Sequence, residues 1–135
     1  MKKCFLLFLA IFVLAGCQGK PVTGETVSTD AGSYQNITVN QLQSMLNNKD
    51  FVLINVHIPF AGDIPNTDLS IPYDQVEQNL SQFPVDKHAK IVLYCRSGRM
   101  SEIAAEKLVS LGYTNVWNLK GGMVGWEQAG LELEK

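Results

Sequence analysis

Two short runs of apolar residues interrupt a chain that otherwise alternates between helical and loop-like patterns. They are FVLINV at residues 51–56 and IVLYC at residues 91–95, and neither contains a charged side chain. Continuous apolar runs of this length are typical of strands buried on both faces of a parallel sheet. A further strand is predicted over residues 115–119, and an edge strand over residues 69–71. Because amphipathic segments separate these strands, we expect an α/β domain whose mainly parallel central sheet is flanked by helices.

The segments between the strands carry the apolar period of helices. Residues 38–48 are predicted to form a helix, because Thr38 and Gln41 have the spacing of a capping box. Apolar residues at positions 76, 80 and 83 predict a second amphipathic helix. A third helix is predicted over residues 104–111, and a short final helix around Trp126.

The N-terminus has the anatomy of an export signal. Lys2 and Lys3 precede an apolar run over residues 5–14, which is too short to span a bilayer as a stable helix. The run leads into LAGC at residues 14–17, which resembles the lipobox of bacterial lipoproteins, where the signal is cut before the cysteine and the cysteine is lipidated. The resemblance implies a signal peptide over residues 1–16, a lipidated Cys17, and an exported lipoprotein anchored in a membrane of the bacterial cell envelope. An ordinary secretory signal with a chance cysteine is the alternative.

The segment after the signal differs in composition from the rest of the chain. Residues 18–36 are rich in Gly, Ser and Thr without an apolar period, so residues 17–36 are predicted to be the lipidated cysteine and a flexible tether. A single domain would then fill residues 37–135. The net charge of −2, about −4 once the two signal lysines are lost, argues against nucleic-acid binding. We expect a monomer.

Cys95 is expected to be the only thiol of the mature domain. Cys4 would leave with the signal and Cys17 would carry lipid, so no disulfide could form within the chain. Cys95 ends its strand, at the edge where parallel sheets bind their ligands. One cysteine and two scattered histidines give no metal-ligand spacing, and no cofactor is expected. A small buried core residue is the alternative role for Cys95.

The loop after Cys95 is predicted to bind an anion. A short loop from a strand to a helix N-terminus can turn several backbone N–H groups toward one point, and Gly98 permits the tight path. The same donors, with the helix dipole, would stabilise a thiolate at Cys95, which is the nucleophilic form. Arg96 and Arg99 would attract an oxyanion if their side chains point inward, whereas solvated surface arginines are the alternative.

The stretch VLYCRSGRMSEIAAEKLVSLGYTNVWNLKGGMVGWEQAG closely resembles the C-terminal half of a single-domain rhodanese, and a weaker resemblance reaches back to about Ile37. The resemblance implies a rhodanese-like sulfurtransferase. Its catalytic Cys95 would accept a sulfane sulfur from thiosulfate or a related persulfide-type donor and pass it to cyanide or a thiol. The donor-binding residues would be those of the loop, namely Arg96, Ser97, Gly98, Arg99, Met100 and Ser101.

The chain departs from the family pattern at one place. Where members usually have Asp-Val-Arg, this sequence has Asn55, Val56 and His57, so a charged pair that supports the active loop is replaced by neutral or titratable groups. Asn55 and His57 could support the site from behind, or His57 could be an ordinary loop histidine. The departure leaves open a second function, a non-catalytic binding or accessory module at the cell envelope.

A phosphatase class with a similar fold supplies a further alternative. Its loop has a cysteine, five further residues and then an arginine. The sixth position after Cys95 is Ser101, and Arg99 comes too early. Phosphatase activity is therefore not expected.

Overall fold

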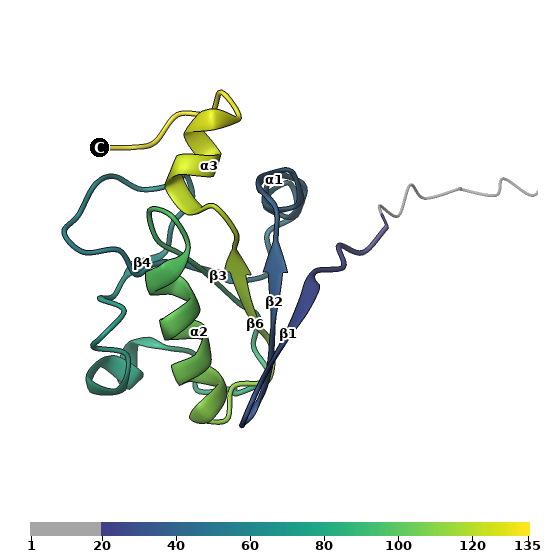
Figure 1. Ribbon diagram of the computed structural model, residues 1–135, viewed down its shortest axis with the longest axis vertical. Coiled ribbons are helices and arrows are strands. Elements are labelled where there is room, and N and C mark those ends of the chain that lie inside the picture. The colour runs from purple at the N-terminus through teal and green to yellow at the C-terminus, as the bar shows by residue number, and fades with distance from the viewer. Residues whose placement is uncertain (1–19) are drawn as a thin grey trace, which may run out of the picture.

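The computed structural model, in which residues 20–135 are described, is built on a six-stranded sheet with the order β1-β2-β6-β5-β3-β4 (Figure 1). β1 runs antiparallel to β2, and every other neighbouring pair is parallel. The strands are β1 (Glu25–Thr29), β2 (Gly32–Ile37), β3 (Val52–Asn55), β4 (Leu69–Ser70), β5 (Ile91–Tyr94) and β6 (Val116–Leu119). The helices are α1 (Val39–Leu46), α2 (Arg99–Ser110) and α3 (Gly122–Gln128), with a 3-10 helix η1 (Glu77–Gln82). The predicted α/β fold class is confirmed.

The two apolar runs form neighbouring strands inside the sheet. β3 and β5 pair in parallel with Asn55 opposite Tyr94, and all four residues of β5 are buried. Successive side chains of a strand point to opposite faces. Ile91 and Leu93 accordingly belong to one hydrophobic cluster, and Val92 and Tyr94 belong to another. The sheet therefore has a core on each face, as the continuous apolar pattern predicts.

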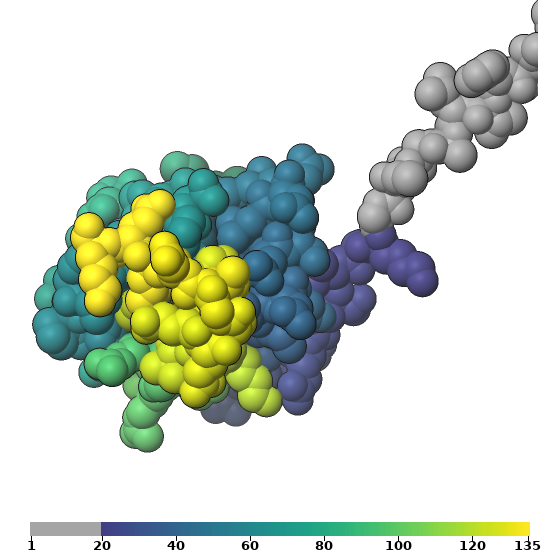
Figure 2. Space-filling model, turned by 90° about the horizontal axis from the view of Figure 1, so that it is seen from above, coloured from purple at the N-terminus to yellow at the C-terminus, as the bar shows by residue number. Residues whose placement is uncertain are grey.

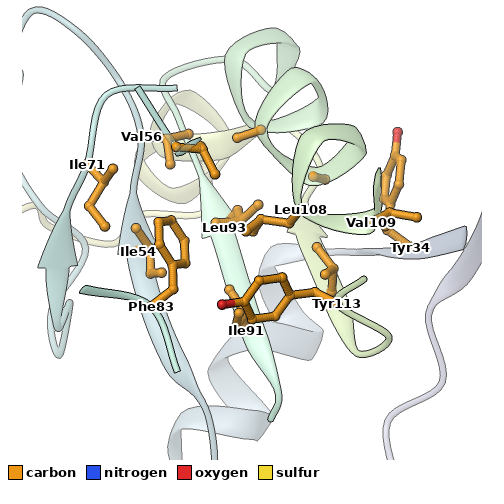
Figure 3. Close-up of a cluster of buried hydrophobic side chains, with 14 of the residues drawn as sticks. Tyr34, Ile54, Val56, Ile71, Phe83, Ile91, Leu93, Leu108, Val109 and Tyr113 are labelled. Atoms are coloured by element: carbon orange, nitrogen blue, oxygen red, sulfur yellow. The ribbon is translucent and has the colours of Figure 1, made fainter. Parts of the chain in front are cut away.

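α2 covers the first core, which Figure 3 shows in close-up. Leu108 and Val109 of α2 pack with Ile54 and Leu93 of the sheet, and Phe83 closes one side of the cluster. Each of these five side chains is at most 5% exposed. Burying an aliphatic or aromatic side chain of this size contributes about 1.5–3 kcal/mol, so this face is a main source of stability.

α1 and α3 cover the second core, on the opposite face. Leu42 of α1 and Met123 and Trp126 of α3 pack with Val92 and Tyr94 of the sheet. α1 begins at the predicted capping box: the Gln41 N–H donates to Thr38 Oγ1 (3.2 Å) and the Thr38 N–H donates to Gln41 Oε1 (2.9 Å). The capping-box prediction is confirmed.

Residues 25–36 do not form the flexible tether that their composition predicts. β1 and β2 make an antiparallel hairpin, from Glu25 opposite Asn36 to Thr29 opposite Gly32. β2 also joins the parallel sheet beside β6. The ladder hydrogen bonds and the burial of Tyr34 offset the entropy that this polar segment loses when it becomes ordered. Among the described residues, only residues 20–24 precede the first strand.

The second predicted amphipathic helix is a shorter and irregular element. Residues 77–82 form the 3-10 helix η1, and Asn79 inside it has non-helical angles (φ −116°, ψ 22°). Val76 and Phe83, which suggested the helical period, are both buried at the ends of η1. The prediction was right for these two buried residues and wrong for the type of helix, and the third apolar position, Leu80, is half-buried.

The predicted signal peptide and Cys17 lie outside the described residues. Within residues 20–135, the helices are too short and too polar to cross a bilayer.

Candidate active site

Cys95 lies directly after β5, at the carboxyl end of the parallel strands. Its side chain is 1% exposed, and it is the one free cysteine within residues 20–135. The backbone N–H of Gly98 donates to its Sγ at 3.0 Å, and Ser101 Oγ lies 3.4 Å from the same sulfur. Gly98 is the N-cap of α2 with φ 118°, a conformation that favours glycine. The loop therefore turns one backbone donor, where the sequence predicts several, and the positive end of α2 toward the sulfur.

The first turn of α3 holds the Cys95 loop in place. The Met123 N–H donates to the Cys95 carbonyl and the Val124 N–H donates to the Arg96 carbonyl, both at 2.9 Å. This approach depends on Gly122, because a Cβ built there would collide with the carbonyl oxygens of Cys95 and Arg96. The Gly-Gly pair at the start of α3 is thus a structural support of the candidate site, a role that its sequence does not predict.

The predicted donor-binding residues divide into exposed and buried groups. Arg96, Ser97 and Arg99 are exposed, whereas Gly98 and Ser101 are buried, and Met100 is half-buried and packs against the first core. Ser101 Oγ donates to the Gly98 carbonyl at 3.0 Å, which fixes the hydroxyl beside the sulfur. All six residues therefore surround or follow Cys95, but only Gly98 and Ser101 contact its Sγ.

Arg96 borders an open hollow of about 400 Å³ next to the loop. We call it the tail hollow, because its walls come from the Cys95 loop, the segment after β3, α3 and the C-terminal residues 131–135. Arg99 is not among the residues that line it. The lining residues are Phe60, Ala61, Gly62, Arg96, Met123, Glu127, Leu133 and Lys135.

Asn55 organises the segment after β3, which borders the site. Its side chain is 2% exposed, and its amide nitrogen donates to the Gly62 carbonyl (3.0 Å) and to Asp63 Oδ1 (2.9 Å). Its amide oxygen accepts from the His57 N–H at 2.9 Å. The neutral Asn55 side chain therefore connects the loop after β3 to the carboxyl end of the sheet. Burial lowers the pKa of His57, and the nearby Arg96 charge lowers it further, so both favour the neutral imidazole.

A second set of hydrogen bonds around Tyr94 was not predicted. The Tyr94 hydroxyl accepts from the Ile64 N–H (3.0 Å), donates to Asp63 Oδ1 (3.2 Å) and lies 2.6 Å from Thr67 Oγ1. Asp63 also exchanges two backbone hydrogen bonds of 2.7 Å with Glu134, which fastens residues 131–135 to the same loop. Burial raises the pKa of the Tyr94 phenol, so the hydroxyl keeps its proton for these bonds. The partners are about thirty residues apart in sequence, and no local pattern indicates them.

No cluster of metal-ligating side chains occurs in the part of the chain that the structure describes. The site holds a buried sulfur that accepts a backbone N–H hydrogen bond, a serine hydroxyl 3.4 Å from that sulfur, and an exposed arginine next to it.

The geometry defines a class of protein: an α/β domain with a candidate nucleophilic cysteine under a glycine-capped loop at the carboxyl end of its sheet. Comparison with known proteins leads to the same class. A family profile described as "Rhodanese-like domain" matches residues 38–129, and the chain belongs to this family. A profile for the prokaryotic membrane lipoprotein lipid attachment site matches residues 1–18. The protein is thus an exported lipoprotein anchored to a membrane.

Individual relatives cover the same part of the chain. A protein of Allochromatium vinosum named "Sulfurtransferase" is 33% identical over 94 residues, which cover 67% of this chain and 85% of the relative. A mouse protein named "Thiosulfate sulfurtransferase/rhodanese-like domain-containing protein 3" is 32% identical and covers 73% of this chain and 72% of its own length. A crystal structure of a rhodanese-like domain protein from Staphylococcus aureus superposes with a TM-score of 0.61 at 31% identity, covering 74% of this chain and 98% of that one.

Proposed function

We propose that this lipoprotein is a sulfurtransferase in which Cys95 carries the transferred sulfur as a persulfide. The observation that supports the proposal most strongly is the 3.0 Å hydrogen bond from the Gly98 N–H to Cys95 Sγ. A donor aimed at the sulfur from a helix N-terminus favours the thiolate over the thiol. It would favour the negative charge of a persulfide in the same way.

The reaction needs two displacements at sulfur. The Cys95 thiolate attacks the outer sulfur of thiosulfate, the sulfur–sulfur bond of the donor breaks, and sulfite leaves with the bonding electrons. Cyanide or a thiolate then attacks the terminal sulfur of the persulfide, and Cys95 leaves again as a thiolate. Neither step requires an oxidant, a reductant or a metal.

The surroundings of Cys95 suit a small or projecting sulfur donor. With 1% of its side chain exposed, Cys95 can be reached only by a group that projects from its carrier, such as the outer sulfur of thiosulfate or of a persulfide. The exposed Arg96 in the wall of the tail hollow could hold the anionic part of the donor. The relative from Allochromatium vinosum, named as a sulfurtransferase, supports the same assignment. We expect a monomer that uses no cofactor.

Turnover measurements test the proposal. The mature chain carrying Cys17→Ser, which removes the lipid, should transfer sulfur from thiosulfate to cyanide, while the same chain with Cys95→Ser should show none. The rate of sulfur transfer can also be compared between the wild-type sequence and Asn55→Asp. This change keeps the size of the side chain and removes the amide group that donates to the Gly62 carbonyl. If the wild-type sequence transfers sulfur neither from thiosulfate nor from a persulfide, the accessory-module function takes the place of the enzymatic one.

A further inference from the structure

The first described residues of the chain, up to residue 24, pack against one end of the domain. Val22 packs against the second core, and Gln41 of α1 donates from Nε2 to the Thr23 carbonyl at 3.0 Å. Gly24 lies so close to β2 that a Cβ there would come within 2.8 Å of the Gln35 side chain and 2.9 Å of the Asn36 carbonyl. Residues 22–24 are therefore fixed beside α1, at the carboxyl end of β2.

This is the same end of the sheet that carries Cys95. Glu25 pairs with Asn36 at the carboxyl end of β2, and β2 is separated from β5 by β6 alone. At about 4.8 Å per strand, the carboxyl ends of β2 and β5 lie about 10 Å apart. α1 also contacts α3, which in turn supports the Cys95 loop. Figure 2 looks onto this end and shows α3 in yellow beside α1 in blue, with the purple segment of residues 20–25 at the edge.

The link from the lipidated residue to this end is short. Four residues lie between Cys17 and Val22, so the five Cα–Cα steps of a fully extended link span at most about 18 Å. β2 has six residues and is about 20 Å long. The hairpin turn at Asp30 and Ala31 lies at the far end of β2 (Figure 1), so the link is too short to let that end rest on the membrane.

The side chains at this end suit a layer of lipid headgroups. Phe60, in the segment after β3, is 61% exposed, and phenylalanine is among the apolar side chains with which interfacial segments insert below lipid headgroups. Arg96 and Lys135 line the same hollow as Phe60, together with the single acid Glu127. Exposed arginine and lysine side chains are attracted to anionic lipid headgroups.

We propose that the α1–α3 end of the domain, with the tail hollow and the loop of Cys95, faces the headgroup layer of the membrane that holds the lipid anchor. The candidate site then opens into the space between domain and membrane. Small donors and acceptors that are dissolved near the headgroups, or bound to them, can reach Cys95 in this space. A large soluble protein is kept away from Cys95 by the membrane. This orientation does not depend on sulfur transfer, so it can be tested separately.

Fluorescence quenching by lipids tests the orientation. Ala129→Cys, at the end of α3, and Ala31→Cys, in the hairpin turn, are matched exposed alanines at the two ends of the domain. Each would carry a fluorophore in the lipidated protein with Cys95→Ser, in vesicles of phosphatidylethanolamine and phosphatidylglycerol with a quencher attached to the headgroups. The fluorophore at position 129 should lose most of its emission, and the fluorophore at position 31 should lose little.

Lengthening the link is the decisive control. Inserting about twenty Gly and Ser residues between Gln18 and Gly19 adds an average reach of about 25 Å, which should make the quenching at the two positions similar. Cys17→Ser should abolish quenching at both positions, because the lipid is lost. Equal quenching at the two positions with the natural link, or stronger quenching at position 31, would overturn the proposed orientation. Quenching at neither position would overturn it as well.

Discussion

Cys95 and Arg96 are neighbours in the chain, but their side chains lie in different surroundings. Cys95 is buried in the first core, accepts a hydrogen bond from the Gly98 N–H and lies 3.4 Å from Ser101 Oγ, whereas Arg96 is exposed to solvent. The proposed interaction of Arg96 with an anionic donor would therefore be screened by salt, while the short hydrogen bond to the buried sulfur would be affected much less. Binding of the donor should depend on ionic strength more than the reactivity of the sulfur does.

The two arginines should differ in their effect on donor binding. Arg96 lines the tail hollow and Arg99 does not, so Arg96→Ala should raise the KM for thiosulfate more than Arg99→Ala. A hydrogen bond to a charged group contributes about 1.5–3 kcal/mol, and solvent exposure places Arg96 at the lower end, which corresponds to a change of about tenfold in KM. Steady-state kinetics of both variants measure the difference. Unchanged kinetics in both would mean that the arginines are ordinary surface residues.

His57 should titrate below its ordinary pKa of 6.5 in the folded protein. Burial is the larger cause and the Arg96 charge the smaller, so Arg96→Gln should raise the midpoint without bringing it back to 6.5. Since folding lowers this pKa, protons bind more readily to the unfolded chain, and the contribution of His57 to stability is lost as the pH falls below 6.5.

NMR titration of the His57 ring provides the measurement, with Arg99→Gln as the control that should leave the midpoint unchanged. A midpoint at or above 6.5 in the wild-type protein, or one that Arg96→Gln leaves in place, would contradict the assigned environment.

At the scale of elements, the close approach of the first turn of α3 decides whether the Cys95 loop keeps its shape. Gly122 and Gly130 both have positive φ angles, 54° and 80°, but only Gly122 lies against other backbone atoms. Gly130→Ala should cost about 1–2 kcal/mol of unfolding free energy for its left-handed backbone. Gly122→Ala should cost about 1–3 kcal/mol more, because the new methyl group overlaps with the Cys95 and Arg96 carbonyls. Denaturant unfolding measures both free energies. Equal costs would show that the close contact of Gly122 with the Cys95 and Arg96 carbonyls is not needed for stability.

The elements that the sequence predicts best are those with strong local patterns. The apolar runs of β3 and β5 and the capping box of Thr38 were predicted within one or two residues. The hairpin of β1 and β2 was missed because its residues are mostly polar and exposed, and only Tyr34 and Ile37 are buried. Its stability comes from pairing with β6, a partner some eighty residues away. η1 was predicted as a regular helix because an apolar spacing alone does not distinguish α from 3-10 geometry.

The candidate site shows the same division between local and long-range information. The loop from Cys95 to Ser101 is contiguous in sequence, and its glycine and serine could be assigned before the structure was known. The support from Asn55, Tyr94 and Asp63 depends on contacts between distant segments and on the return of residues 131–135. Side chains that hold a loop in place rarely form a local motif, so these residues could be found only in three dimensions.

At the scale of the whole molecule, the lipid anchor and the domain form one functional arrangement. The hairpin that replaces most of the predicted tether shortens the link between membrane and domain. A flexible segment of residues 18–36 would have let the site explore all directions, whereas the short link keeps the carboxyl end of the sheet near the headgroups. In the proposed orientation, the order of residues 20–37 would therefore influence which compounds can reach Cys95.

The most direct test of the central claim, a persulfide on Cys95, is the intact mass of the mature Cys17→Ser chain after incubation with thiosulfate. The wild-type site should gain the mass of one sulfur atom and lose it again on addition of cyanide. Cys95→Ser, which keeps nearly the same shape in a buried position, should fold normally and gain nothing. No gain in the wild-type site with either thiosulfate or a persulfide donor, or an equal gain in Cys95→Ser, would contradict the claim.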